Sequence, residues 1–250
     1  MERKNWTREQ SLVAFSLYCR TPFGKIHHRN PEIIKAAEVL GRTPDALAMK
    51  MVNFASFDPT HKSRGVGGLS HASRLDEEIW DEFNRTPEEI AVESEVEIEK
   101  VFPAKDNEIT ELPTGPTEIE RMVKSRLVQT FFRNVVLSSY DFTCSFCGLS
   151  IREMLVASHI IPWKTSVERR ADPRNGICLC SFHDPAFDRG ILGVSSELEI
   201  IVSNRISMVP KNEMARIGLF ELSGNPVRLA DRFQADEEAL SYHRHNIFRS

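Results

Sequence analysis

The sequence predicts an α+β protein in which a small helical N-terminal module precedes a mixed domain that holds a zinc ion. Three observations support this fold class. Helical patterns with clear start signals fill residues 1–55, four of the five cysteines lie between positions 144 and 180, and an acidic, proline-containing stretch separates these two regions. With 250 residues, of which 41% are hydrophobic and 27% charged, the chain has enough material for one or two globular domains.

Residues 1–55 have the start and stop signals of three short helices. Thr7 and Gln10 form a capping-box pattern, in which each side chain satisfies the other residue's backbone N–H. Asn30-Pro31 and Thr43-Pro44 each place a capping side chain before a proline, which is favoured at the first helical position. Gly41 ends the second helix, so a tight turn joins it to the third. This arrangement predicts a helix-turn-helix-like module.

We expect the helical module to span residues 1–85 and to contact DNA. The exposed face of its third helix is predicted to carry Lys50 and Asn53, which could meet DNA there. The alternative is a plain helical bundle with a solvated face. Residues 60–74 are basic and rich in glycine and serine, so they form either a phosphate-contacting loop or an ordinary surface loop. A short helix is expected around Glu77–Phe83.

The net charge of −4 hides a strong charge pattern along the chain. Residues 1–75 carry 12 basic and 6 acidic side chains, residues 76–120 carry 3 and 16, and residues 121–190 carry 10 and 6. Two basic modules therefore flank an acidic connector, which is compatible with a polyanionic partner. Residues 86–118 combine the acids with four prolines and predict a linker. The competing interpretation is a short edge strand around Val92–Ile98.

The chain lacks the signals of membrane or secreted proteins. No apolar run approaches the roughly 18 residues of a membrane helix, and the N-terminus has no apolar signal region. We therefore expect no membrane partner and a cytoplasmic location. In such a chain an odd number of clustered cysteines favours metal ligands over disulfides.

Two short motifs with equal spacing predict a structural Zn²⁺ site. Cys144 and Cys147 form a Cys-x2-Cys knuckle that is followed by glycine, and Cys180 and His183 repeat that spacing further along the chain. Three thiolates and one imidazole are a common tetrahedral zinc set. Cys178 is the alternative fourth ligand. The remaining alternative is that Cys178 and Cys180 are simply buried residues of an apolar strand.

The C-terminal half resembles the HNH endonuclease family, and more closely its restriction-type prokaryotic branch. A histidine, His159, ends a β-branched run that Pro162 closes, as expected at the end of a strand. The resemblance covers about residues 125–250 and implies a ββα-metal nuclease domain, which we place at 119–250. The residues that carry it are Cys144-x-x-Cys147, Ser158-His159-Ile-Ile-Pro162-Trp163, Asn175-Gly176, Leu179–Gly190 and Leu240–Phe248.

The resemblance implies metal-dependent hydrolysis of DNA phosphodiester bonds, in restriction or defence against foreign DNA. His159 matches the general base, a task that suits a side chain titrating near neutral pH. Asn175 matches the motif asparagine, whose amide would fix the loop that orients His159. Asp184 would bind one catalytic divalent cation, Mg²⁺ or Mn²⁺, at the scissile phosphate. Because duplex cleavage needs two cuts and each chain has one site, a homodimer is expected.

Two departures from the family pattern leave alternatives open. Many HNH sites place an aspartate directly before the first histidine, where this chain has Ser158. Asp184 stands where other members often have histidine. If His183 bound the catalytic metal, zinc would have to recruit Cys178 or be absent. We favour His183 for zinc and Asp184 for the catalytic cation. Asp188 is either a second metal ligand or the partner of a neighbouring arginine, and we expect the latter.

A basic loop lies between the expected base and the motif asparagine. Its arginines, Arg169, Arg170 and Arg174, either hold the DNA backbone or form an ordinary solvated surface. The main alternative function is a zinc-stapled DNA-binding regulator with a decayed nuclease site, which Ser158 and Asp184 favour. His159 together with Asn175 favours the enzyme, because a pure binding protein has no need of that pair. A weaker third alternative is a nuclease toxin or an enzyme acting on RNA.

Overall fold

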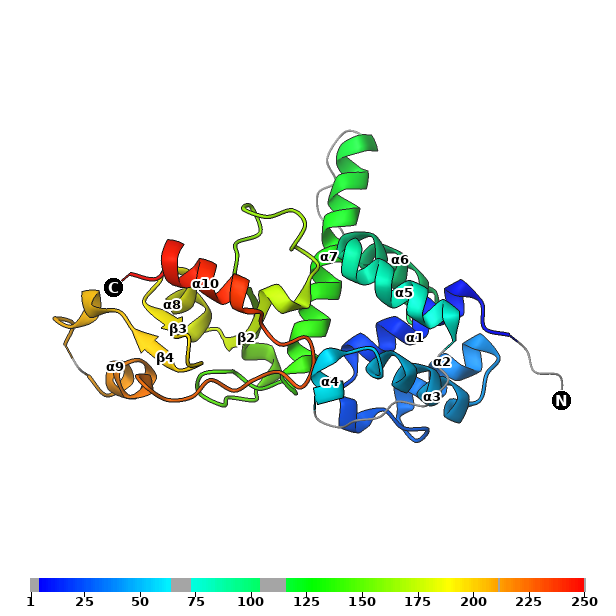
Figure 1. Cartoon of the computed structure of the whole chain (residues 1–250), viewed down its shortest axis with the longest axis horizontal. Helices are drawn as coiled ribbons and strands as arrows, with labels where there is room; N and C mark the ends of the chain where they lie inside the picture. The colour runs from blue at the N-terminus through cyan, green and yellow to red at the C-terminus, as the bar shows by residue number, and fades with distance from the viewer. Residues whose placement is uncertain (1–4, 64–72, 104–115, 211, 250) are drawn as a thin grey trace. The chain divides into compact units, whose positions relative to one another are not determined.

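The computed structural model describes residues 5–63, 73–103, 116–210 and 212–249 (Figure 1). The chain divides into two compact units, 1–135 and 136–250, and the domain bounds expected from the sequence stay a prediction. Within the described residues, no helix is both long and apolar enough to cross a membrane.

The first unit is helical, and the three helices expected within residues 1–55 are confirmed. Thr7 Oγ1 accepts from the Gln10 backbone N–H at 3.3 Å, and Gln10 Oε1 accepts from the Thr7 N–H at 3.4 Å, which completes the capping box. Gly41 ends the second helix in the left-handed conformation, at φ 62°. The α-helices are α1 (Arg8–Arg20), α2 (Pro31–Leu40), α3 (Pro44–Ala55), α4 (Pro59–Ser63), α5 (Arg74–Arg85), α6 (Pro87–Val101) and α7 (Pro116–Ser139), which continues into the second unit.

Buried aromatic rings form the centre of the first unit. Phe15 of α1 lies 5.3 Å from Phe54 of α3 and 5.1 Å from Phe83 of α5, measured between ring centroids. Phe83 also meets Phe131 of α7 edge to face at 5.8 Å. All four side chains are at most 1% exposed. Burial of one such ring stabilises a fold by roughly 1.5–3 kcal/mol, so helix packing rests mainly on this aromatic core.

The linker interpretation is wrong for residues 87–101, which form α6, and so is the edge-strand alternative. Pro87 begins the helix, and α6 packs along α1. Its buried side chains recur at helical spacing, and its acids pair with cations of α1: Glu93 with Arg8, and buried Glu95 with Arg20. The acidic residues therefore serve helix packing instead of extending the chain. Residues 104–115 of the expected linker, and 64–72 of the basic loop, lie outside the described residues.

Lys50 is not on an exposed face, contrary to our expectation. Its side chain is 3% exposed and forms an ion pair with fully buried Asp76 of α5. The Lys50 ammonium also donates to Ser73 Oγ at 3.2 Å, and Asn53 Nδ2 donates to Asp76 Oδ2 at 3.2 Å. The physical reason is that α5 covers this side of α3. A helical spacing pattern gives no sign of a partner that comes from a later helix.

The second unit contains a two-stranded sheet with one helix against it. Strands β1 (Leu155–His159) and β2 (Gly176–Cys180) are antiparallel, with His159 opposite Gly176, and α8 (His183–Asp188) packs on both. A second antiparallel pair joins β3 (Leu192–Val194) to β4 (Ile200–Val202). The unit also contains α9 (Glu213–Gly218), α10 (Glu237–Asn246) and the 3₁₀ turns η2 (Arg152–Met154), η3 (Pro173–Asn175), η4 (Asn204–Ile206) and η5 (Phe220–Leu222), whereas η1 (Phe23–Lys25) belongs to the first unit.

The C-terminal helix α10 lies beside α8 and β3 (Figure 1). The buried His243 ring stacks on Phe187 of α8, with centroids 3.7 Å apart, and its Nε2 donates to the Phe187 carbonyl at 3.0 Å. Gly190 follows at φ 67°, and a Cβ there would lie 2.0 Å from the Ile247 carbonyl oxygen. Only glycine permits this close approach, so the end of the chain is held firmly against the ββα arrangement.

Candidate active site and metal centre

A tight turn after α7 carries Cys144 and Cys147, the first two of the expected zinc ligands. The Cys144 N–H donates to the Leu149 carbonyl at 2.8 Å, and the Gly148 N–H donates to the Cys144 carbonyl at 3.0 Å. Gly148 adopts φ 75°, which glycine tolerates without strain. The Ser145 N–H donates to the Cys178 carbonyl of β2 at 2.7 Å. This bond attaches the turn to the strand that ends in Cys180.

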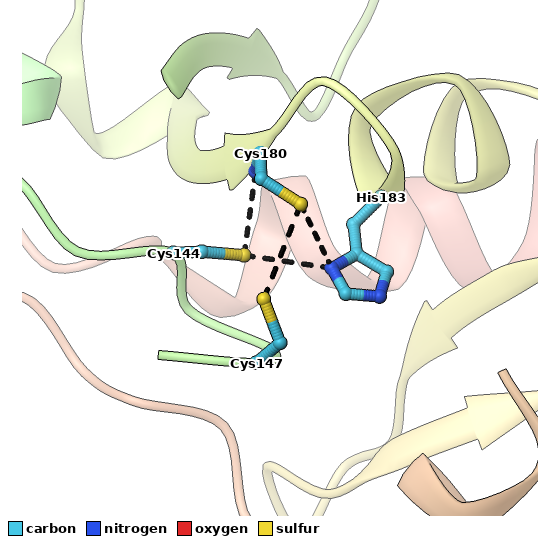
Figure 2. Close-up of side chains that lie close together, drawn as sticks. All are labelled: Cys144, Cys147, Cys180 and His183. Atoms are coloured by element: carbon cyan, nitrogen blue, oxygen red, sulfur yellow. Dashed lines mark hydrogen bonds between the residues drawn. The ribbon is translucent and has the colours of Figure 1, made fainter. Parts of the chain in front are cut away.

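The four expected zinc ligands point toward one another (Figure 2). Their ligand atoms all lie within 4.8 Å of one another. Cys180 Sγ is 3.2 Å from His183 Nδ1 and 4.0 Å from Cys147 Sγ. Two sulfurs that bind one tetrahedral zinc at about 2.3 Å would be ~3.8 Å apart. Both the spacing and the donor chemistry therefore fit a metal such as zinc.

A hydrogen bond at Nε2 of His183 leaves Nδ1 as the nitrogen that can bind a metal. His183 Nε2 lies 2.9 Å from the Gly218 carbonyl oxygen. Because a carbonyl only accepts, Nε2 carries the hydrogen and the lone pair of Nδ1 faces the sulfurs. Among the described residues the cluster contains His183 and not Cys178, so His183 is the residue that could complete a set of four ligands. Gly218 is distant in the chain, and no motif in the sequence marks it as a partner.

The electrostatics of the cluster favour a thiolate before any metal binds. The neighbouring Cys147 thiol lowers the pKa of Cys144 against the opposing effect of burial. The Cys180 backbone N–H also donates to Cys144 Sγ at 3.3 Å. Since the thiolate is the metal-binding form, Cys144 is prepared for this role.

His159 lies at the end of β1 with one ring nitrogen committed to the backbone. Its Nε2 is 3.0 Å from the Arg170 carbonyl oxygen, so Nε2 donates and Nδ1 is the basic nitrogen. The Trp163 ring meets it edge to face, with centroids 5.5 Å apart. Burial lowers the pKa of His159 below its ordinary 6.5. The imidazole is therefore neutral at pH 7, as a base must be.

Asn175 ties together the loop between β1 and β2. Its side chain is 1% exposed and sits in η3. Asn175 Oδ1 accepts from the Ile161 N–H at 2.8 Å, while Nδ2 donates to the carbonyls of Ile161 at 3.1 Å and Arg169 at 3.2 Å. The Asn175 side chain thus joins Ile161, at the start of the loop, to Arg169. Arg169 directly precedes Arg170, whose carbonyl contacts His159.

The three loop arginines contact the protein itself. The Arg169 side chain is 14% exposed and pairs with Asp236, with further oxygens from Asp172 at 3.4 Å and Glu238 at 3.2 Å. Arg170 Nε donates to the Trp163 carbonyl at 2.8 Å. Arg174 Nε donates to Asp172 Oδ1 at 2.8 Å, and its side chain is 34% exposed. These arginines build the loop, and the ion pairs of Arg169 had no recognisable signal in the sequence.

Two carboxylates lie one turn apart on α8. Asp184 is half-buried in the first turn, and Asp188 ends the helix. Partial desolvation raises the pKa of Asp188, and the Asp184 carboxylate adds to that rise. Arg189 and the Ser158 hydroxyl of β1 act in the opposite direction. The Asp188 carboxylate therefore lies beside Ser158, the residue that precedes His159.

Comparison with known families agrees with this geometry. Residues 144–195 match the HNH endonuclease family, a segment that holds the metal cluster, both strands of the first sheet, α8 and β3. The matched segment is therefore similar to an HNH endonuclease domain, and it covers about a fifth of the 250 residues. No curated protein matches the chain.

Proposed function

We propose that this protein is a metal-dependent endonuclease that hydrolyses DNA phosphodiester bonds, in restriction or defence against foreign DNA. The HNH domain at residues 144–195 supports nuclease chemistry. The observation that carries the proposal is the state of His159. Its Nε2 is held by a backbone carbonyl, and burial keeps the ring neutral with Nδ1 as the basic atom.

In the proposed reaction His159 acts as the general base. Nδ1 accepts a proton from a water molecule, whose oxygen attacks phosphorus as the bond to the 3′ oxygen breaks. Asn175 does not react. Its three hydrogen bonds hold the loop whose Arg170 carbonyl orients the imidazole.

The acidic pair on α8 fits the catalytic cation that this chemistry requires. Asp184 would hold Mg²⁺ or Mn²⁺, since carboxylate oxygens are preferred ligands of both, and Asp188 lies one helical turn away. Ser158 adds a hydroxyl where many HNH sites have a carboxylate, so Asp188 is well placed to supply the missing charge. When bound, a divalent cation neutralises the phosphate and stabilises the leaving oxygen.

The rest of the chain has supporting roles in this proposal. The Cys144, Cys147, Cys180 and His183 cluster holds a structural Zn²⁺ that keeps the turn after α7 against β2 and α8. The partly exposed Arg174 contacts the DNA backbone, and the helical first unit helps to hold DNA. Two chains act together on a duplex, because each carries one such site.

A plasmid-nicking assay with Mg²⁺ or Mn²⁺, with and without EDTA, tests the proposal. Wild-type protein should cleave in a metal-dependent way, and His159→Ala should lose roughly 10²–10⁴-fold in rate with its zinc retained. The matched control is His245→Ala, which removes an exposed histidine of α10 in the same unit and should cleave normally. Wild-type cleavage by His159→Ala would refute the assignment of the base.

One observation favours a second candidate function. Ser158 offers no carboxylate beside His159, as expected of a zinc-stapled DNA-binding regulator whose nuclease site has decayed. That function predicts DNA binding without cleavage on both unmodified and modified DNA, with either cation. Metal-dependent cleavage that His159→Ala abolishes would exclude it.

A further inference from the structure

We infer that Arg169 and Asp236 are positioning residues for His159. Their ion pair anchors the loop whose Arg170 carbonyl sets the tautomer and orientation of the imidazole. The inference rests on the proposed function, because it gives His159 the role of base. It reassigns Arg169 from DNA contact, the role expected from the sequence, to the internal support of the site.

The Arg169 side chain is largely buried and is surrounded by acidic partners. Its guanidinium is largely shielded from solvent and faces three carboxylates, those of Asp172, Asp236 and Glu238. Asp172 belongs to the same loop, whereas Asp236 and Glu238 lie at the start of α10, far along the chain. A cation that is this fully engaged is a poor phosphate ligand, because DNA would have to displace its existing partners.

Two consecutive backbone carbonyls connect the Arg169 ion pair to His159. The Arg169 carbonyl accepts from Asn175 Nδ2, so both its side chain and its backbone are fixed. The next carbonyl along the chain, that of Arg170, accepts from His159 Nε2. The planar peptide group between the two residues is also fixed at its other end, because the Arg170 N–H donates to the Val167 carbonyl at 3.3 Å. Only φ and ψ of Arg170 then separate the anchored group from the Arg170 carbonyl.

Asp236, which anchors Arg169, is itself held by several hydrogen bonds. Asp236 Oδ1 caps α10 by accepting from the Ala239 N–H at 2.8 Å, and Oδ2 pairs with Arg169. The Asp236 N–H donates to the Arg174 carbonyl at 3.1 Å, so the same residue holds the loop at two points. Further along α10, His243 attaches the helix to Phe187 of α8. The loop is therefore supported from a helix that is itself fixed to the ββα arrangement.

Loosening this anchor has a defined consequence at His159. Without a fixed Arg170 carbonyl, Nε2 loses its acceptor, and the hydrogen can move to Nδ1, which removes the basic lone pair. Water also reaches the ring, which weakens the effect of burial that lowers the pKa of His159, whereas loss of the hydrogen bond to the Arg170 carbonyl removes an interaction that raises it. The base would then be wrongly oriented for part of the time, although substrate binding need not change.

The test compares two variants in the first turn of α10. Asp236→Asn keeps an Oδ1 that can cap the helix but removes the charge facing Arg169. Glu237→Gln removes a neighbouring carboxylate whose partner is Arg244, so it is the matched control. We expect Asp236→Asn to lower kcat roughly 10-fold with KM within about 2-fold, and to shift the acid limb of the pH–rate profile away from that of wild type. Glu237→Gln should match wild type.

Substitutions of Arg169 test whether a conservative replacement restores activity. Arg169→Gln should reproduce the Asp236→Asn defect, and Arg169→Lys, which keeps one cationic contact, should recover part of kcat. The inference is overturned if Asp236→Asn and Glu237→Gln give equal kcat and equal pH profiles in zinc-loaded protein. A defect confined to KM would also overturn it, because that result indicates a role in DNA binding.

A measurement that needs no cleavage separates this inference from the proposed function. ¹⁵N NMR of the His159 ring reports which nitrogen carries the hydrogen, and its titration reports the pKa. Wild type and Glu237→Gln should show a protonated Nε2 and the same pKa, whereas Asp236→Asn should show mixed tautomers. If wild type never cleaves but this difference appears, the proposed enzyme fails and the positioning stands. If the spectra are identical, the positioning fails.

Discussion

Each of the two units of this protein is stabilised internally by a different kind of interaction. The first packs long helices, together with most of α7, around buried aromatic rings, so apolar burial accounts for its stability. The second has short strands and depends on polar links: the Cys/His cluster, the Asn175 amide, the Arg169 ion pairs and the His243 contact. Short elements bury little surface, and cross-links of this kind replace a large core.

The comparison also shows that a buried ionic group serves the two units differently. In the first unit the buried ion pair of Lys50 and Asp76 joins α3 to α5. In the second, the Arg169 ion pairs support a loop that contacts the candidate base. Similar chemistry therefore has consequences for activity only where it lies beside a reactive side chain.

The largest expected effect comes from removing the metal cluster. Cys144→Ser should leave the second unit unfolded, because a structural zinc contributes about 10–16 kcal/mol of apparent binding free energy that is also folding free energy. The aromatic core should keep the first unit protected. Hydrogen exchange, read separately for residues 5–135 and 136–249, measures both units in one sample.

Cys178→Ala is the control for that experiment. Cys178 is buried in β2, close to Cys180 in the same strand, but lies outside the cluster. This variant should keep one zinc per chain by elemental analysis. A folded, zinc-free Cys144→Ser protein would contradict the division between the two units.

A smaller effect is expected from breaking the buried ion pair of the first unit. Lys50→Met leaves the Asp76 carboxylate buried without its cation, which typically costs about 3–5 kcal/mol. Urea unfolding of the first unit measures this change. Lys25→Met, at an exposed position, should change the free energy of unfolding by no more than about 0.5 kcal/mol. Equal stability of the two variants would show that the Lys50–Asp76 pair does not hold α3 to α5.

The next effect is acid sensitivity in the second unit. Burial lowers the pKa of His243 to about 4, against an ordinary value of 6.5, so the unfolded chain binds the proton more tightly than the folded one. The stability that this neutral ring contributes is complete above pH 6.5 and is lost as the pH falls toward 4, by an amount on the order of 3 kcal/mol.

His243→Gln tests this acid sensitivity, because glutamine can still donate to the Phe187 carbonyl but does not titrate. Unfolding of the second unit should depend less on pH between 6.5 and 4 in this variant than in wild type. Since both proteins keep the same thiol ligands, their difference isolates His243. Parallel pH curves would show that His243 does not sense the proton.

The smallest effect is expected at a surface ion pair of the first unit. Arg74 and Glu78 pair one turn apart on α5, and the Arg74 side chain is 91% exposed. Arg74→Ala should change the free energy of unfolding by only about 0.3–0.5 kcal/mol. A loss as large as that of Lys50→Met would mean that burial does not distinguish the two ion pairs.

Several features of the fold and site follow from short-range patterns in the sequence. The caps at Thr7, Asn30 and Thr43 located the first three helices, because a cap and its partner are near neighbours in the chain. The spacing of Cys144 with Cys147, and of Cys180 with His183, likewise located the metal cluster. Each cap and each ligand pair lies within one turn of chain, whereas folding brings the two ligand pairs together.

Other features depend on which distant segments fold against one another. Residues 87–101 have the composition of a linker and still form a helix, because α1 supplies an apolar surface and cations for the glutamates. The burial of Lys50 depends on α5, the hydrogen bond of His183 on Gly218, and the support of His159 on Asp236. Such partners are set by the packing of whole elements, in which the free energy of burial is shared among many side chains, so no local spacing encodes them.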